Sequence, residues 1–204
     1  MSASQITDKL WVGSWSDARQ VVNDKDWSVI TVANDANVKG QYFFPLTDPG
    51  DGENDAAFFE MAIDTTIECL REDKNVLVHC QSGVNRSASV VIAVLMSKHG
   101  LGLSEAYEKV FTRRKLIKPQ MIYLDRACDY CEKEVPLDFE RPKPSFDDAE
   151  QVVIKAYKKV LRRKPDPGGL ESYTKQIKLG RMSQVDLEKH LYSSGEYSRK
   201  FKNE

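Results

Sequence analysis

The sequence lacks a long apolar run. Its longest uninterrupted apolar stretch is Val90–Met96, far short of the roughly 20 residues that a membrane-spanning helix needs. The first eight residues show no basic segment followed by an apolar core, so we expect no signal peptide and no membrane insertion.

Cysteine is also scarce, with 4 residues in a chain of 204. This number is too small for a disulfide scaffold and favours a reducing, cytoplasmic location. Cys128 and Cys131 form a lone C-x-x-C pair without a second cysteine pair or a histidine cluster, so we interpret them as partly buried helix residues.

No charge of one sign dominates, because the chain has 30 Lys and Arg residues and 31 Asp and Glu residues. This balance argues against a nucleic-acid partner and against charge-driven binding to a membrane surface. The total hides two unlike parts: residues 1–144 carry 17 basic and 22 acidic side chains, whereas residues 145–204 carry 13 and 9. Three prolines lie between Val135 and Pro144, which is typical of a linker.

Strand and helix patterns alternate in the first part of the chain. Strands are predicted at 10–12, 27–32, 41–46 and 75–79, and helices at 58–70, 87–97, 104–110 (with Ser104 as N-cap) and 119–135. This alternation predicts an α/β fold with a mostly parallel central sheet flanked by helices on both faces.

Residues 146–204 show helical spacing throughout and predict a small all-α domain. A break is expected at Lys164–Gly169, with the second helix starting near Leu170 and ending at Gly180. Ser183 is expected to cap a third helix, and a short last helix to begin at Ser194.

Residues 76–90, VLVHCQSGVNRSASV, carry the chemistry. Five residues separate Cys80 from Arg86, a strand pattern precedes Cys80, and a helical run follows Arg86. With Gly83 in the loop, this strand–loop–helix directs backbone N–H groups inward to form an anion site. A helix N-terminus and a nearby arginine lower a thiol pKa from about 8.5 to roughly 3.5–7.5, which predicts a Cys80 thiolate. Arg86 matches two phosphate oxygens and Ser87 can donate to sulfur, so the pattern predicts phosphoryl transfer.

This segment resembles the signature of the cysteine-based protein tyrosine phosphatases, and among them the dual-specificity phosphatases. Their His-Cys, five residues, Arg and Ser/Thr match His79, Cys80, Arg86 and Ser87, and the resemblance covers most of residues 5–134. It implies a reaction without metal or cofactor, in which the cysteine takes the phosphoryl group and an aspartic acid protonates the leaving oxygen. The aspartate then activates water. The phosphate would be bound by Gln81, Ser82, Gly83, Val84, Asn85 and Arg86, while His79 orders the loop by hydrogen bonding rather than transferring protons.

The resemblance places the general acid roughly thirty residues before the cysteine. Asp48 lies at about that distance and opens a Gly/Pro-rich loop after a strand, which suits a general acid. Asp51 is the main alternative, and Asp55 also competes.

Several features test the resemblance. The chain has Gln120 where the family has an asparagine that braces the phosphate loop, so either Gln120 replaces that brace with a longer arm or the brace is absent. The phosphate loop has no lysine, which argues against an inositol-lipid substrate. Residues 113–115 (Arg-Arg-Lys) are either a solvated helix end or a site for an acidic or doubly phosphorylated substrate. Cys69 is a possible disulfide partner for an oxidised Cys80.

The C-terminal part resembles a module known as the domain of unknown function 4214. The matching residues are Ala156-Tyr157, Val160–Leu170, Tyr173, Gly180 and Ser193–Tyr197. The resemblance implies no chemistry. The module is either a compact appendage or a docking module, whose excess of basic residues favours an acidic partner.

We therefore predict a catalytic domain at 1–134, a Pro-rich linker at 135–145 and a helical module at 146–204. The expected activity is hydrolysis of phosphotyrosine and phosphoserine/phosphothreonine in a phosphorylated protein substrate, through a phosphocysteine intermediate. One alternative is a phosphatase acting on a phosphorylated glycan, a nucleotide or an RNA 5′ end. Another is a catalytically silent phosphate-binding module.

Overall fold

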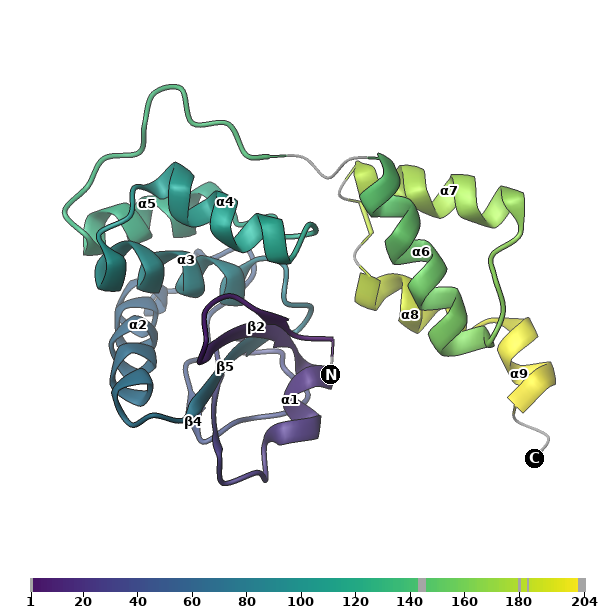
Figure 1. The fold of residues 1–204 in the computed structure, drawn as a ribbon, viewed down its shortest axis with the longest axis horizontal. Coiled ribbons are helices and arrows are strands. Elements are labelled where there is room, and N and C mark those ends of the chain that lie inside the picture. Colours follow the sequence, from purple (N-terminus) through teal and green to yellow (C-terminus); the bar gives the residue numbers. More distant parts are fainter. Residues whose placement is uncertain (1, 143–145, 180, 183, 202–204) are drawn as a thin grey trace. The chain divides into compact units, whose positions relative to one another are not determined.

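The computed structural model describes residues 2–142, 146–179, 181–182 and 184–201 (Figure 1). The chain divides into two compact units, Met1–Pro142 and Lys143–Glu204. Residues 135–142 of the predicted linker form neither helix nor strand, and Leu137 among them is fully exposed. Residues 143–145 of that linker lie outside the described residues.

The first unit is built on a five-stranded sheet of order β1-β2-β5-β3-β4. Its central strand is β5 (Asn75–Cys80), which pairs in parallel with β2 (Leu10–Ser14) and with β3 (Trp27–Thr31). Strand β4 (Tyr42–Phe43) is parallel to β3, and β1 (Ser4–Gln5) is antiparallel to β2. The predicted mostly parallel sheet is confirmed.

Alternate residues of β5 face opposite sides of the sheet. Val78 and Cys80 belong to the main hydrophobic cluster, whereas Leu77 packs with Ala18 of helix α1 (Trp15–Val21) on the other side. Helix α1 is absent from the sequence-based prediction. Its sequence signal is the S-x-x-D capping box at its start, in which the carboxylate of residue 17 accepts from the backbone and hydroxyl of residue 14.

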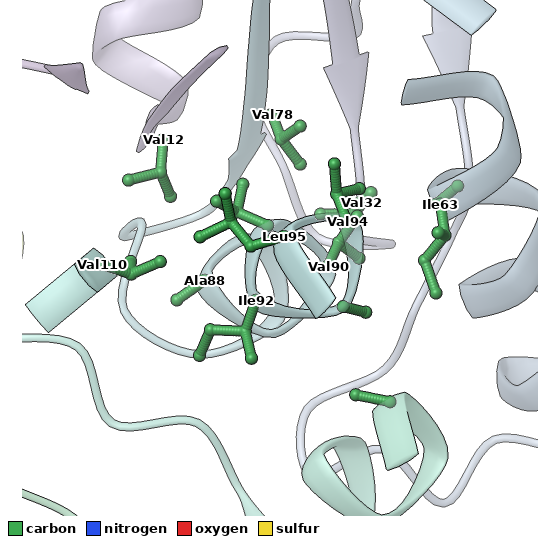
Figure 2. Close-up of a cluster of buried hydrophobic side chains, with 14 of the residues drawn as sticks. Val12, Val32, Ile63, Val78, Ala88, Val90, Ile92, Val94, Leu95 and Val110 are labelled. Atoms are coloured by element: carbon green, nitrogen blue, oxygen red, sulfur yellow. The ribbon is translucent and has the colours of Figure 1, made fainter. Parts of the chain in front are cut away.

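Four helices contribute to the main cluster: α2 (Asp55–Arg71), α3 (Arg86–His99), α4 (Leu103–Arg113) and α5 (Met121–Tyr130). Helix α3 is apolar on nearly all sides because it contacts α2, α4, α5 and the sheet. Figure 2 shows its side chains among residues of the neighbouring elements, with Val12, Val32, Ile63, Val78, Ala88, Val90, Ile92, Val94, Leu95 and Val110 labelled.

Some predicted boundaries are wrong for local reasons. The predicted strand 41–46 shortens to β4: Phe44 N still donates to the Thr31 carbonyl of β3, but Leu46 N turns back to the Phe44 carbonyl, and both side chains are buried. The N-cap of α4 is Gly102 rather than Ser104. Helix α5 ends at Tyr130, and Glu132 beyond it has a φ of 52°, a left-handed conformation that stops the helix.

The second unit is all-α, as predicted. Its described helices are α6 (Phe146–Leu161), α7 (Pro167–Lys178), α8 (Gln184–Tyr192) and α9 (Gly195–Phe201). Helix α7 begins before the predicted Leu170, because the Asp166 side chain caps it by accepting from Gly169 N.

The expected end at Gly180 and cap at Ser183 lie outside the described residues. Within the part of the chain that the structure describes, no helix is long and apolar enough to span a bilayer.

Candidate active site

The phosphate loop of the prediction connects β5 to α3 at the carboxyl end of the parallel strands. Ligands of parallel sheets bind outside this edge. Cys80 ends β5 beside Ser14 of β2, and the first turn of α3 begins at Arg86. The loop is held to the start of α1, because Trp15 N donates to the Gln81 carbonyl at 3.4 Å.

The Cys80 thiol lies buried at the base of this loop. Its Sγ is 3.2 Å from Gly83 N, which donates to it, and 3.3 Å from Ser87 Oγ. Burial by itself raises the pKa of Cys80, but the charge of Arg86 and the hydrogen bonds from Ser87 and Gly83 outweigh it and lower the pKa below its ordinary value. The site therefore favours the thiolate, which is the nucleophilic form.

Only glycine fits at position 83. Its φ is 72°, in the left-handed region that disfavours side chains. A Cβ there would also lie 2.5 Å from the Gly13 carbonyl oxygen and 2.5 Å from Arg114 Nη2. The loop thus packs closely against both neighbours.

Arg114 fastens the outer side of the loop. Its Nε donates to the Gly83 carbonyl at 2.6 Å and its Nη2 to the Ser82 carbonyl at 3.1 Å. Because these carbonyls point outward, the peptide N–H groups are free to point toward Cys80, as Gly83 N does.

Arg114 therefore departs from both interpretations of residues 113–115, a solvated helix end and a substrate site, whereas Arg113 at the end of α4 fits the first. Arg113 is exposed, and Lys115 Nζ lies 4.9 Å from the Phe111 ring centre. The middle arginine instead supports the loop. Sequence reasoning missed it because nothing in the pattern distinguishes it from its two neighbours.

The Arg86 guanidinium has one hydrogen-bonded nitrogen, one without a partner among the described residues and one paired with a carboxylate. Its Nη1 donates to Asp35 Oδ1 at 2.6 Å and to the Leu46 carbonyl at 3.1 Å. Its Nε is buried and has no hydrogen-bond partner among the described residues, and its Nη2 lies 3.8 Å from Asp48 Oδ2. Nε and Nη2 form one edge of the guanidinium, which matches two oxygens of a phosphate.

Asp48 is the carboxylate that the structure brings to this arginine. Its Oδ1 accepts from Asn85 Nδ2 at 3.2 Å and from Gln120 Nε2 at 3.3 Å. Asp51 is exposed, and no described contact joins it to the phosphate loop.

Asp55 serves a different purpose from Asp48. It is 2% exposed, and its carboxylate accepts from Thr47 N, Thr47 Oγ1 and Gly52 N. Tyr123 of α5 donates to the Thr47 carbonyl at 2.6 Å and lies 3.3 Å from the same carboxylate. Asp55 and Tyr123 thus anchor the loop that carries Asp48.

His79 contacts the carbonyl of Cys80, not its thiol. Its Nδ1 lies 3.2 Å from Cys80 O, and its Nε2 lies 2.7 Å from Thr31 Oγ1, which accepts from Gly40 N. This network assigns the proton to Nδ1 and lets the Thr31 hydroxyl donate to Nε2. Burial lowers the pKa of His79 to about 4, so the ring is neutral at pH 7.

The brace of the phosphate loop runs in an unexpected direction. Asn85 Oδ1 accepts from the backbone N of Gln120 at 2.9 Å, so the loop side chain reaches out to the start of α5. The Gln120 side chain extends to Asp48 instead. Neither expected alternative, a longer Gln120 arm on the loop or no brace, describes this arrangement.

The remaining cysteines lie apart from this network. All four cysteines are free thiols, and the Cys69 side chain contacts Tyr42. Burial raises the pKa of Cys128 to about 11, which keeps this helix thiol protonated. Among the described residues, no group of three or more His, Cys, Asp or Glu side chains is arranged to hold a metal ion.

Comparison with known proteins shows the family to which the chain belongs. The profile of the dual specificity phosphatase catalytic domain matches residues 10–133. The chain belongs to the dual-specificity phosphatase family. Residues 145–201 match a second profile, a domain of unknown function (DUF4214).

Curated dual-specificity phosphatases and related enzymes share part of the sequence. Human dual specificity protein phosphatase 9 is 37% identical over 78 residues, which are 38% of this chain and 20% of that protein. The tyrosine-protein phosphatase yvh1 of Schizosaccharomyces pombe is 28% identical over 142 residues, which are 66% of this chain and 43% of that protein. The chain thus spans less than half the length of these two relatives.

Solved structures share the fold of the dual-specificity phosphatase unit. Human DUSP28 superposes with a TM-score of 0.54 at 22% identity, over 65% of this chain and 94% of that one. The human tyrosine phosphatase-like serine/threonine/tyrosine-interacting protein gives 0.52 at 24% identity, over 63% and 94%. At these identities the likeness shows the fold alone.

Proposed function

We propose that this protein hydrolyses phosphate esters of tyrosine, serine and threonine in proteins through a phosphocysteine at Cys80. The observation that carries the proposal is the buried edge of Arg86, whose Nε has no partner and whose Nη2 faces Asp48, beside a buried thiol with a lowered pKa. A phosphate dianion supplies the oxygens that this edge and the loop N–H groups lack.

In the first step, the phosphate binds to the backbone N–H groups of residues 81–86 and to Arg86. The Cys80 thiolate attacks phosphorus, so an S–P bond forms while the bond to the leaving oxygen breaks. Asp48 gives its proton to the leaving oxygen, which departs as a neutral hydroxyl.

In the second step, the Asp48 carboxylate takes a proton from water, and the water oxygen attacks phosphorus. The S–P bond breaks, and the thiolate leaves with the Ser87 hydroxyl 3.3 Å from its sulfur. Inorganic phosphate is released, and Asp48 is protonated again for the next cycle.

The substrate class follows from the loop and the relatives. The loop Gln81–Asn85 has no lysine, which argues against an inositol-lipid substrate, and the relatives are named for dual specificity. We propose a phosphorylated protein as substrate and a cytoplasmic location.

The proposal also assigns a role to each part of the chain. Residues 1–134 form the catalytic domain, 135–145 the linker and 146–204 a module that docks an acidic partner.

Hydrolysis of 4-nitrophenyl phosphate and of phosphopeptides in the presence of a metal chelator tests the proposal. Wild type should turn over both, and Cys80→Ser should abolish turnover, whereas the matched Cys131→Ser should retain it. A folded wild type that turned over neither substrate would overturn the proposed hydrolysis. If Asp51→Asn were to slow phosphotyrosine hydrolysis while Asp48→Asn did not, the assignment of the general acid would be wrong.

A further inference from the structure

Two side-chain amides converge on one oxygen of Asp48. Asn85 Nδ2 and Gln120 Nε2 lie 3.2 and 3.3 Å from Oδ1, and Arg86 Nη2 lies 3.8 Å from Oδ2. We propose that Asn85 and Gln120 form an amide clamp, a pair of positioning residues that hold Asp48 so that Oδ2 carries and delivers its proton. This inference rests on the proposed function.

The chemistry of the amides assigns the two oxygens. An amide N–H can only donate, and Oδ1 accepts from two of them, so its lone pairs are engaged. Oδ2 is the oxygen on the Arg86 side, where the phosphate and the leaving oxygen meet. With the clamp in place the two carboxyl oxygens of Asp48 are no longer equivalent, and Oδ2 is the one that faces the leaving oxygen.

Asn85 is rigid enough to act as a clamp. It is 7% exposed, and its Oδ1 accepts from Gln120 N at 2.9 Å, so both ends of its amide are engaged. Its own carbonyl accepts from Ser89 N and Ser89 Oγ in the first turn of α3. Because Asn85 directly precedes Arg86, it fixes Asp48 relative to the nitrogens that bind phosphate.

Gln120 completes the clamp from α5. It is the N-cap residue of that helix, and its Nε2 donates to Asp48 Oδ1, an oxygen that accepts both in the carboxylate and when the proton is on Oδ2. The anchors made by Asp55 and Tyr123 act on Thr47 and Gly52, on either side of Asp48. The Asp48 side chain itself is 45% exposed, and its described polar contacts are the two amides and Arg86.

If Asn85 and Gln120 position the proton of Asp48, the rate lost on their removal should depend on the leaving group of the substrate. Protonation matters most when the leaving group is a strong base, such as a phenol with a pKa of about 10 like that of tyrosine. A nitrophenolate leaves readily without a proton. Loss of the clamp should therefore slow hydrolysis of phenyl phosphate much more than that of 4-nitrophenyl phosphate.

Two substitutions in the full chain test the clamp. Gln120→Met removes Nε2 and keeps the backbone N that braces Asn85, and Asn85→Ser removes Nδ2 and the brace. Gln120→Met should lower kcat/KM for phenyl phosphate about fivefold, the equivalent of one hydrogen bond, and that for 4-nitrophenyl phosphate less than about twofold. Asn85→Ser, which also loosens the phosphate loop, should lower kcat/KM for both substrates, and more for phenyl phosphate than for 4-nitrophenyl phosphate. Gln20→Met, at an exposed position of α1, is the control and should match wild type.

A double-substitution cycle shows whether the amides act through the general acid. In an Asp48→Asn background there is no proton to position, so Gln120→Met should cause no further loss. Equal losses on both substrates, or a loss that persists in this background, would overturn the clamp. If Asn85→Ser does not fold, Gln120→Met decides alone. Absence of hydrolysis by wild type would instead overturn the proposed function.

Discussion

Acid should destabilise this protein through His79, the neutral histidine next to Cys80. The ring is 0% exposed and its pKa is about 4, whereas a histidine of the unfolded chain has a pKa of about 6.5. Between these two values the unfolded chain binds a proton that the folded protein does not. The stabilisation is therefore fully present above pH 6.5 and is lost as the pH falls toward 4.

The size of the effect follows from the two pKa values. The difference of about 2.5 corresponds to about 3 kcal/mol, of which about 2.5 kcal/mol is lost between pH 7.5 and pH 4.5. This is a large share of the 5–15 kcal/mol typical of a folded domain. Carboxylates also titrate in this range, so the contribution of His79 is obtained as a difference between wild type and a variant that cannot titrate there.

Urea unfolding followed by tryptophan fluorescence measures this difference. The three tryptophans, Trp11, Trp15 and Trp27, all lie in the first unit, so the signal reports the unit that contains His79. The free energy of unfolding of His79→Gln should fall less with acid than that of wild type, by about 2.5 kcal/mol from pH 7.5 to 4.5. His99 provides the comparison: burial and the nearby Lys109 and Lys98 lower its pKa as well, but it is exposed, so His99→Gln should change the pH dependence less than His79→Gln does.

Equal losses in the free energy of unfolding of wild type and His79→Gln between pH 7.5 and pH 4.5 would refute this reasoning. A second measurement remains decisive if the variant folds poorly. In the NMR spectrum of wild type, the His79 ring should stay neutral well below pH 6, and titration near pH 6.5 would contradict the buried network with Thr31 and the Cys80 carbonyl.

Three further predictions concern the phosphate loop, the core and the anchor of the loop that carries Asp48. Arg114→Met should lower kcat/KM for 4-nitrophenyl phosphate about tenfold or more, because the carbonyls of Ser82 and Gly83 lose a charged donor. Steady-state kinetics measure this loss, and an unchanged kcat/KM would contradict the supporting role of Arg114. Leu95→Ala should lower the free energy of unfolding by about 2–5 kcal/mol in urea titrations, and a loss below 1 kcal/mol would contradict its complete burial. Asp55→Asn should slow phosphotyrosine hydrolysis by loosening the Asp48 loop, whereas Asp64→Asn on the same helix should leave kcat unchanged; equal rates for the two variants would refute the anchor.

The strand–loop–helix around Cys80 was predictable because its signals are local. A strand pattern, a loop glycine and a helical run lie within residues 76–90, and the pKa of the thiol depends on that arrangement. Helix α1 was missed because it is only seven residues long and its apolar stripe has few members. The predicted strand 41–46 failed because buried loop residues such as Leu46 are as apolar as strand residues.

Long-range partners were not predictable from the pattern. Asp35 and Arg114 approach the phosphate loop from segments 51 and 31 residues away, and neither carries a local signal. The same holds for Asn85, which reads as an ordinary loop residue until Asp48 and Gln120 are placed beside it.

The sequence by itself determined the residues to which the proposed chemistry is assigned, because Cys80, Arg86 and the loop between them lie within seven positions of one another. Only the tertiary structure decided how they are arranged. Which nitrogen of Arg86 has no partner, which aspartate lies beside the guanidinium, and which oxygen of Asp48 accepts the two amides all depend on contacts between elements far apart in the chain. Such contacts form when the sheet and its helices pack, and no periodicity or spacing encodes them.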